Sequence, residues 1–150
     1  MSEKKNIEIK EVTESSEELY SVMVNLLSQL TSSKLSFSQK DLERIVGSES
    51  SILFTAVDMN HDNKIVGMLT LAIIDIPTGK LARIEDVVVD KAARGQGIGE
   101  KITIAAIEKA KELGIKKIDL TSNPKREAAN RLYQRLGFKQ RTTNIYRYEI

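Results

Sequence analysis

Apolar and polar residues follow two different periods along this chain, and the change of period marks the expected elements. Residues 6–12 alternate with the period of two that is typical of a half-buried strand. From Leu19 to Leu30 the apolar residues return every three or four positions, which predicts an amphipathic helix. A second, shorter helix is expected to begin at Ser38 and to end near Gly47.

The middle of the chain predicts strands over residues 51–58, 64–74 and 83–90, separated by turn-forming residues at 60–63 and 77–79. An apolar stripe then predicts a helix from Ile98 to Leu113, which Gly114 ends. A strand is expected over residues 116–121.

The last third predicts one helix and two closing strands. Asn123 is expected to cap a helix that begins at Pro124 and ends before Gly137. Residues 138–141 and 145–150 are expected to pair as a hairpin.

This order of elements predicts an α+β fold. Consecutive strands joined by short turns pair antiparallel, whereas a strand that follows a crossover helix runs parallel to the strand before it. We therefore expect one domain over residues 1–150, with a mixed sheet of about six to seven strands and helices on both faces.

Composition excludes several kinds of site. The chain has no cysteine and one histidine, His61, so it has no disulfide, no thiolate nucleophile and no histidine metal cluster, and we expect no metal. A net charge of only +2 does not favour nucleic acid as a partner. No apolar run is long enough to span a membrane and the N-terminus lacks a signal-peptide core, so a cytoplasmic protein without membrane partners is expected.

The most informative stretch is a glycine cluster, Gly95, Gly97 and Gly99, between a valine-rich strand and a long helix. The first N–H groups of a helix have no intrahelical partner, and glycines let the main chain approach a ligand closely. This arrangement predicts a phosphate-binding loop. The spacing fits neither the Walker loop nor the dinucleotide-binding fingerprint, and a plain strand-to-helix turn is the alternative.

Two motifs resemble the coenzyme A signatures of the GNAT superfamily of N-acetyltransferases. Arg94, Gly97 and Gly99 form R-x-x-G-x-G, which is similar to the pyrophosphate loop, and the segment NPKREAANRLYQRLGF at residues 123–138 is similar to the second signature. The resemblance implies acetyl-CoA as co-substrate. It also implies the GNAT fold, in which two parallel strands splay apart to admit the pantetheine arm.

The resemblance further implies a set of cofactor-binding residues. Main-chain groups of Val87, Val88 and Val89 would pair with pantetheine, and Asn130 would contact the cofactor arm. Asn123 is a weaker candidate, because helix capping is the favoured explanation for it. The pyrophosphate would bind the side chain of Arg94 and the N–H groups of the loop, which are those of Gly95, Gln96, Gly97, Ile98, Gly99 and Glu100.

Acetyl transfer to an amine needs a base and a proton donor for the leaving thiolate. Glu85 and Asp86 are the nearest carboxylates to the cofactor edge, and strand alternation sends them to opposite faces. We favour Glu85, acting directly or through water, although a surface ion pair with Arg83 explains it as well. Tyr133 is the candidate acid, with a core aromatic as the alternative, and a bulge near Val88 would help an N–H group to polarise the thioester carbonyl.

The expected function is direct N-acetylation of a primary amine, without a covalent acyl-enzyme. Small amines, amino acids, aminoglycosides and protein amino groups all stay open as acceptors, and the run EDVVV at residues 85–89 resembles the glucosamine-6-phosphate acetyltransferase branch. A non-catalytic acyl-CoA-binding module is the alternative, and a homodimer is possible. We expect the acceptor pocket between the first two helices and the loops near Pro77 and Thr142.

Overall fold

Local hydrogen bonds explain where the first two helices begin in the structure, a computed structural model that describes residues 6–150. Helix α1, Glu17–Leu30, begins after Ser16, whose hydroxyl accepts a hydrogen bond from the Leu19 N–H at 3.0 Å. Helix α2, Gln39–Val46, begins after Ser38, which forms a capping box with Asp41. The start of α2 agrees with the sequence prediction, because the capping signal is local.

Five strands form one mixed sheet in the order β1-β2-β3-β4-β5. They are β1 Ile7–Glu11, β2 Ser51–Asp58, β3 Lys64–Ile76, β4 Gly79–Val89 and β5 Ile118–Asp119. The first four pair antiparallel in chain order, and β5 pairs parallel to β4. The predicted fold class and the parallel pair after the crossover helix are therefore confirmed.

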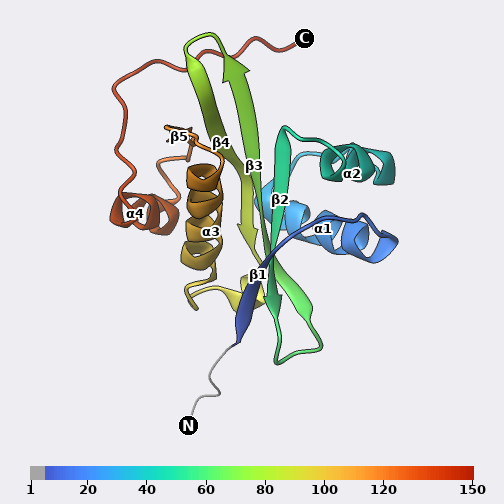
Figure 1. Cartoon of the computed structure of the whole chain (residues 1–150). Helices are drawn as coiled ribbons and strands as arrows, with labels where there is room; N and C mark the ends of the chain where they lie inside the picture. Colours follow the sequence, from blue (N-terminus) through green and yellow to red (C-terminus); the bar gives the residue numbers. More distant parts are fainter. Residues whose placement is uncertain (1–5) are drawn as a thin grey trace. The chain divides into compact units, whose positions relative to one another are not determined.

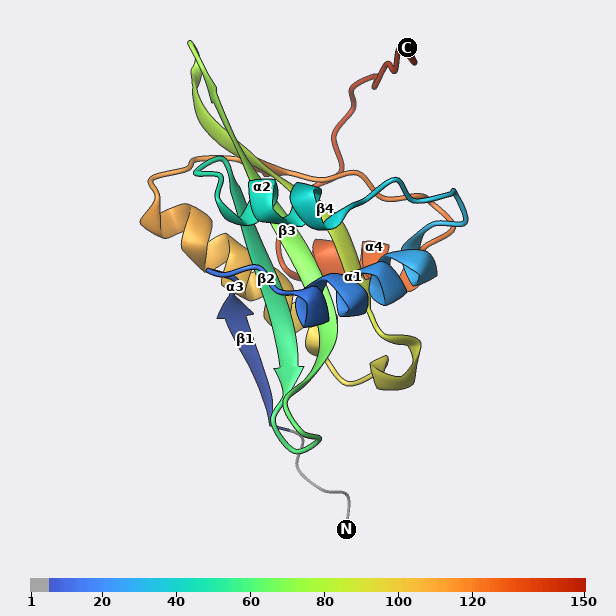
Figure 2. The same ribbon diagram turned by 90° about the vertical axis from the view of Figure 1, so that its right-hand side faces the viewer.

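Helices cover both faces of this sheet, as expected. Figure 1 shows α1 and α2 on one face and α3, Ile98–Glu112, on the other, and Figure 2 views the face that α1 and α2 cover. The core under α1 and α2 consists of apolar side chains that are almost fully buried: Leu19, Met23, Leu26, Leu27, Leu42, Leu53, Met68 and Val88. On α3 the buried stripe is Ile98, Ile102, Ala106 and Ala110.

The hairpin between β3 and β4 differs from the prediction in its length. Ile76 pairs with Gly79 around a two-residue turn, so β4 begins before the expected position at Arg83. Because β2 reaches only to Ala72 of β3, the end of this hairpin extends beyond the neighbouring strand. Figure 1 shows it as a two-stranded arm.

The chain divides into two compact units, Met1–Leu120 and Thr121–Ile150. The first contains all five strands and helices α1 to α3, and the second contains helix α4, Glu127–Arg135. The expectation of a single domain over 1–150 stays a prediction. None of the helices formed by residues 6–150 is long and apolar enough to cross a membrane.

Two expectations about the second unit were wrong. Residues 138–150 form no strand, so the described part of the chain has five strands instead of six to seven. Their alternating pattern is that of a strand, but no backbone ladder forms and the apolar side chains stay exposed, namely Ile145, Tyr146, Tyr148 and Ile150.

Helix α4 also begins later than predicted, at Glu127, and Asn123 does not cap it. The side-chain oxygen of Asn123 instead accepts a hydrogen bond from the Lys125 N–H at 2.9 Å, which closes a turn around Pro124. An Asn side chain forms such a turn as readily as a helix cap, so the local sequence fits both.

Candidate active site

Strand β4 carries a bulge at the point where the sequence places its two carboxylates. Two residues of β4, Asp86 and Val87, lie across from the single residue Leu69 of β3. Asp86 has a φ of 51°, a left-handed conformation that only a small fraction of non-glycine residues adopt. The bulge therefore interrupts the strict alternation of side chains along β4.

A pocket of about 670 Å³ lies beside this bulge, within the first unit. Its residues come from α1, from the connection to α2, from α2 itself and from strands β2, β3 and β4. As expected, the first two helices contribute to it, whereas Pro77 does not line it and Thr142 belongs to the other unit.

Of the two neighbouring carboxylates, only Asp86 lines the pocket. Desolvation raises the pKa of Asp86, and the adjacent charge of Glu85 raises that pKa further. Glu85 instead forms an ion pair with Arg83, in which Nε lies 2.9 Å from Oε1. Asp86 therefore lines the pocket in the structure. Glu85 forms the ion pair with Arg83 that the sequence analysis gave as the alternative to a role as base.

Among residues 6–150, no strand pairs with the outer side of the cofactor edge predicted at Val87, Val88 and Val89. Strands β4 and β5 pair only at two positions, Ala82 with Ile118 and Arg83 with Asp119. Beyond them the parallel pair separates, so the outer edge of β4 is available for an extended ligand to add as a strand. The Val89 carbonyl already accepts a hydrogen bond from Arg94 Nε at 3.1 Å.

The glycine loop offers a row of unused donors. Among the described residues, none of the main-chain N–H groups from Gly95 to Gly99 donates a hydrogen bond. Gly97 is the N-cap of α3 and has a φ of 76°, and Gly95 has a φ of 77°. A Cβ atom built on either glycine would meet nothing within 4 Å.

This geometry fits a diphosphate. Unpaired N–H groups at the positive end of a helix bind phosphate oxygens, and Arg94 adds a positive charge at an exposed position. The loop residue Gln96 is exposed, Ile98 is buried, and Glu100 lies in the first turn of α3. The donors of the loop are therefore main-chain groups.

In the second unit the candidate residues belong to α4 and the turn before it. Asn130 Nδ2 donates to the Asn123 carbonyl at 2.9 Å. Tyr133 is buried and packs edge-to-face on Phe138, with ring centroids 5.8 Å apart. Burial raises the pKa of Tyr133, opposed by the charge of Arg126, and its hydroxyl makes no hydrogen bond within residues 6–150. The phenol is thus protonated at neutral pH and able to donate.

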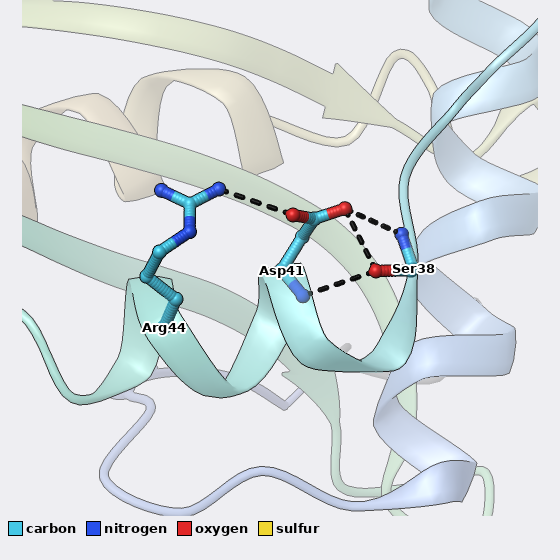
Figure 3. A network of polar contacts seen from close by, with 3 residues as sticks. All are labelled: Ser38, Asp41 and Arg44. Atoms are coloured by element: carbon cyan, nitrogen blue, oxygen red, sulfur yellow. Dashed lines mark hydrogen bonds and ion pairs between the residues drawn. The ribbon is translucent and has the colours of Figure 1, made fainter.

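Sequence reasoning missed the charged residues of the pocket's outer rim, Lys34 and Arg44. Figure 3 shows how α2 holds one of them: Asp41 accepts from the N–H and the hydroxyl of Ser38 and forms an ion pair with Arg44 at 3.2 Å. The hydrogen bond from the Ser38 N–H is the main reason why the pKa of Asp41 is lowered. The Ser38–Asp41 capping spacing was the only sequence signal near this group.

Comparison with known proteins identifies the family. The profile described as "Acetyltransferase (GNAT) family" matches residues 19–138. Over 70 residues the chain is 39% identical to "Probable glucosamine 6-phosphate N-acetyltransferase 2" of Oryza sativa subsp. japonica, a match that covers 47% of this chain and 40% of that protein. Over 60 residues it is 38% identical to "Aminoalkylphosphonate N-acetyltransferase" of Salmonella typhimurium, covering 40% of this chain and 39% of the relative.

Solved structures agree on the fold. An aminoglycoside acetyltransferase, meta-AAC0020, from an uncultured soil metagenomic sample superposes with a TM-score of 0.82 and 22% identity, over 96% of this chain and 95% of the other. The matched segments span about 40% of the length of the first curated relatives. Since the family match covers most of the sequence, the chain belongs to the GNAT family of acetyltransferases, which are acyltransferase enzymes.

Proposed function

We propose that this protein transfers the acetyl group of acetyl-CoA directly to the primary amine of a small molecule bound in the pocket beside Asp86. The observation that carries the proposal is Asp86 itself. Its carboxyl lines a pocket of small-molecule size, its pKa is raised, and it belongs to a bulge where β4 pairs with β3.

The cofactor would bind along this edge and at the glycine loop. Val87, Val88 and Val89 would pair with the pantetheine amides through their main chain. The diphosphate would lie on the N–H groups from Gly95 to Glu100, with the Arg94 guanidinium beside it. Asn130 and Asn123 are proposed as further contacts on the family pattern alone.

The chemistry requires three proton transfers. An alkylamine with a pKa near ~10.4 is mostly protonated at neutral pH, so a base must remove one proton before the nitrogen attacks the thioester carbonyl. Asp86 accepts that proton, directly or through water. As the carbon–nitrogen bond forms and the carbon–sulfur bond breaks, Tyr133 donates its phenolic proton to the departing thiolate. The acylated nitrogen then loses its second proton through water to the Tyr133 phenolate, which restores the phenol and leaves the neutral amide. The chain contains no cysteine, so no thiol is available to carry the acetyl group.

Glu85 stays the alternative base. Its ion pair with Arg83 holds a half-buried residue that is not part of the pocket. Removal of Glu85 would also remove the charge that helps to raise the pKa of Asp86, so a small effect of Glu85 on activity is expected even when Asp86 is the base.

The test is thiol release from acetyl-CoA with a panel of primary amines. We expect release only with an acceptor, about a 100-fold or greater loss of kcat/KM in Asp86→Asn, and about a threefold or smaller change in Glu85→Gln. Tyr133→Phe should lower kcat by about 10-fold or more while acetyl-CoA binding is retained. The reverse order of the two carboxylate variants would make Glu85 the base. Binding of acetyl-CoA without turnover of any amine would favour the non-catalytic acyl-CoA-binding module.

A phosphorylated aminosugar is the second candidate acceptor. It is supported by the 39% identity to a probable glucosamine 6-phosphate N-acetyltransferase, which extends over only 70 residues. Glucosamine 6-phosphate therefore belongs in the amine panel, with glucosamine as its control. Equal kcat/KM values for the two sugars would remove this candidate.

A further inference from the structure

The pocket carries opposite charges on its two walls. Asp86 belongs to β4 and so to the sheet, whereas Lys34 and Arg44 belong to the connection after α1 and to α2, which cover that face of the sheet. Both cationic residues are exposed. Asp41 of α2 also lines the pocket, but its charge is paired with that of Arg44, so Lys34, Arg44 and Asp41 together leave a net positive charge on this wall. A ligand that reaches from the sheet to the rim therefore passes from a negative charge to a net positive charge.

Both cationic side chains have hydrogen-bond donors without a partner among residues 6–150. Asp41 takes one nitrogen of Arg44, Nη2, at 3.2 Å, and Figure 3 shows Nε and Nη1 with no contact to the residues drawn. Lys34 has no hydrogen bond or ion pair among residues 6–150. A guanidinium with free N–H groups and an ammonium that line the same pocket are well suited to bind a carboxylate or a phosphorus oxyanion.

The capping box makes Arg44 a defined part of this rim. Asp41 is held by two contacts from Ser38, at 2.9 Å from its N–H and 2.8 Å from its hydroxyl. Because these contacts lower the pKa of Asp41, it stays ionised and keeps its ion pair with Arg44 over a wide pH range. Asp41 is thus a positioning residue for Arg44.

About half of the pocket's lining is apolar. Of its fifteen residues, eight are aliphatic, thioether or aromatic: Met23, Leu27, Leu30, Leu35, Phe37, Ile45, Leu53 and Met68. Such a surface favours a carbon skeleton over a chain of hydroxyl or amino groups, because polar groups placed there would lose hydrogen bonds to water. Polyamines are disfavoured twice, by the apolar wall and by the cations at the rim.

We infer that the acceptor is a primary amine with an apolar carbon skeleton and an anionic group at its far end, the amine at Asp86 and the anion at Lys34 and Arg44. This inference rests on the proposed function, since it assigns the amine to the Asp86 side of the pocket. A carboxylate, a phosphate or a phosphonate would satisfy the same donors.

Acceptors of equal length test the inference. Pentylamine, δ-aminovalerate and cadaverine share a five-carbon chain and end in a methyl group, a carboxylate and an ammonium. We expect kcat/KM to be about 10-fold higher for δ-aminovalerate than for pentylamine at low ionic strength, and lowest for cadaverine. Aminopentylphosphonate distinguishes a phosphorus oxyanion from a carboxylate as the preferred anion.

Variants then assign the preference to the rim. Lys34→Gln and Arg44→Gln should each lower the ratio of kcat/KM for δ-aminovalerate over pentylamine by about threefold, and the double variant should abolish it. Lys40→Gln is the matched control, since Lys40 is an exposed lysine of α2 that does not line the pocket, and it should keep the ratio. Circular dichroism confirms that each variant is folded.

Two failures are distinguishable. If cadaverine reacts as well as δ-aminovalerate, or if the double variant keeps the ratio, the inference is overturned while the acetyltransferase stands. If no amine releases thiol, the proposed function fails. Calorimetric titration of the three amines into the protein with coenzyme A then decides the charge preference. Stronger binding of δ-aminovalerate than of pentylamine still supports an anion site at Lys34 and Arg44, and equal binding overturns the inference.

Discussion

Asp86 combines two features that are rarely found in one aspartate, a left-handed backbone and a carboxyl whose charge is disfavoured. Its φ of 51° places it in a region that Asn and Asp tolerate better than other side chains. Its raised pKa arises first from desolvation and then from the charge of Glu85. Both features oppose stability, and both are consistent with a residue retained for its chemistry.

A pH series on Asp86→Asn separates these contributions. The folded-state pKa of Asp86 lies above its unfolded value near 3.8, so the native protein loses stability as pH rises through the folded-state pKa. At pH 7 the Asn variant should therefore be more stable than the parent, by no more than about 1 kcal/mol because solvent reaches the site. The difference should vanish in acid, where Asp86 is protonated in both states. Urea denaturation at several pH values measures this difference.

Asp86→Ala serves as the control for the backbone. It removes the same charge, but alanine adopts a positive φ less readily, so a cost of about 1 kcal/mol should offset the gain. A less stable Asn variant at pH 7 would show that the carboxylate makes a stabilising contact, contrary to its raised pKa.

The choice between Glu85 and Asp86 shows what residue patterns leave undetermined. Alternation along a strand predicts that the two side chains point to opposite faces, but it does not say which one lines the pocket. In the structure that residue is Asp86, at the bulge opposite Leu69. A bulge is set by the pairing of two strands and by a φ value that any Asp or Asn is able to adopt, so the local sequence does not show it. Lys34 and Arg44 were missed because nothing in the sequence distinguishes them from other exposed lysines and arginines until the pocket beside them is known.

At the scale of elements, helix α3 offers a matched pair of glycines at its two ends. Gly97 has a φ of 76° and Gly114 a φ of 73°, and a Cβ atom on either would meet nothing within 4 Å. Replacement by alanine therefore imposes the same backbone strain, about 1 kcal/mol, at both ends. Only the Gly97 end carries the free N–H groups of the loop.

We expect Gly97→Ala and Gly114→Ala to lower the free energy of unfolding equally, and only Gly97→Ala to weaken coenzyme A binding, by about 10-fold or more. Gly97→Val should remove binding almost entirely, because a branched side chain covers the donors. Thermal denaturation and calorimetric titration of the same samples give both quantities. Equal affinity of the two alanine variants for coenzyme A would contradict the assignment of the loop.

Elements with a local cause were predicted well, and those that depend on a distant partner were not. Ser38 caps the helix that was expected to begin there, and Gly97 and Gly114 bound α3. Strand β5 shrinks to Ile118–Asp119 because only two of its residues find partners on β4. The same reason explains why the two predicted closing strands do not form. Their residues alternate as a strand would, but residues 138–150 pair with no other strand in the described part of the chain.

At the scale of the whole molecule, the two units differ in how their backbone is held. In the first, strands β2 and β3 are paired on both sides within one sheet. In the second, residues 139–150 make no backbone hydrogen bond with the described residues, and Phe138 is the last residue whose N–H is paired, to the Tyr133 carbonyl at 3.0 Å. Hydrogen exchange is slow for amides that open only on global unfolding and fast for amides without a partner.

Hydrogen–deuterium exchange should therefore divide the chain near residue 138. Amides of residues 139–150 should exchange at close to the rate of an unstructured peptide, while those of β2 and β3 should be protected by about 1,000-fold or more. Adding coenzyme A should slow the amides from Gly95 to Gly99, which are unpaired without it, and leave β2 unchanged. Two protected blocks at 138–141 and 145–150 would contradict the structure, because they would mean that the closing strands predicted from the sequence form in solution after all.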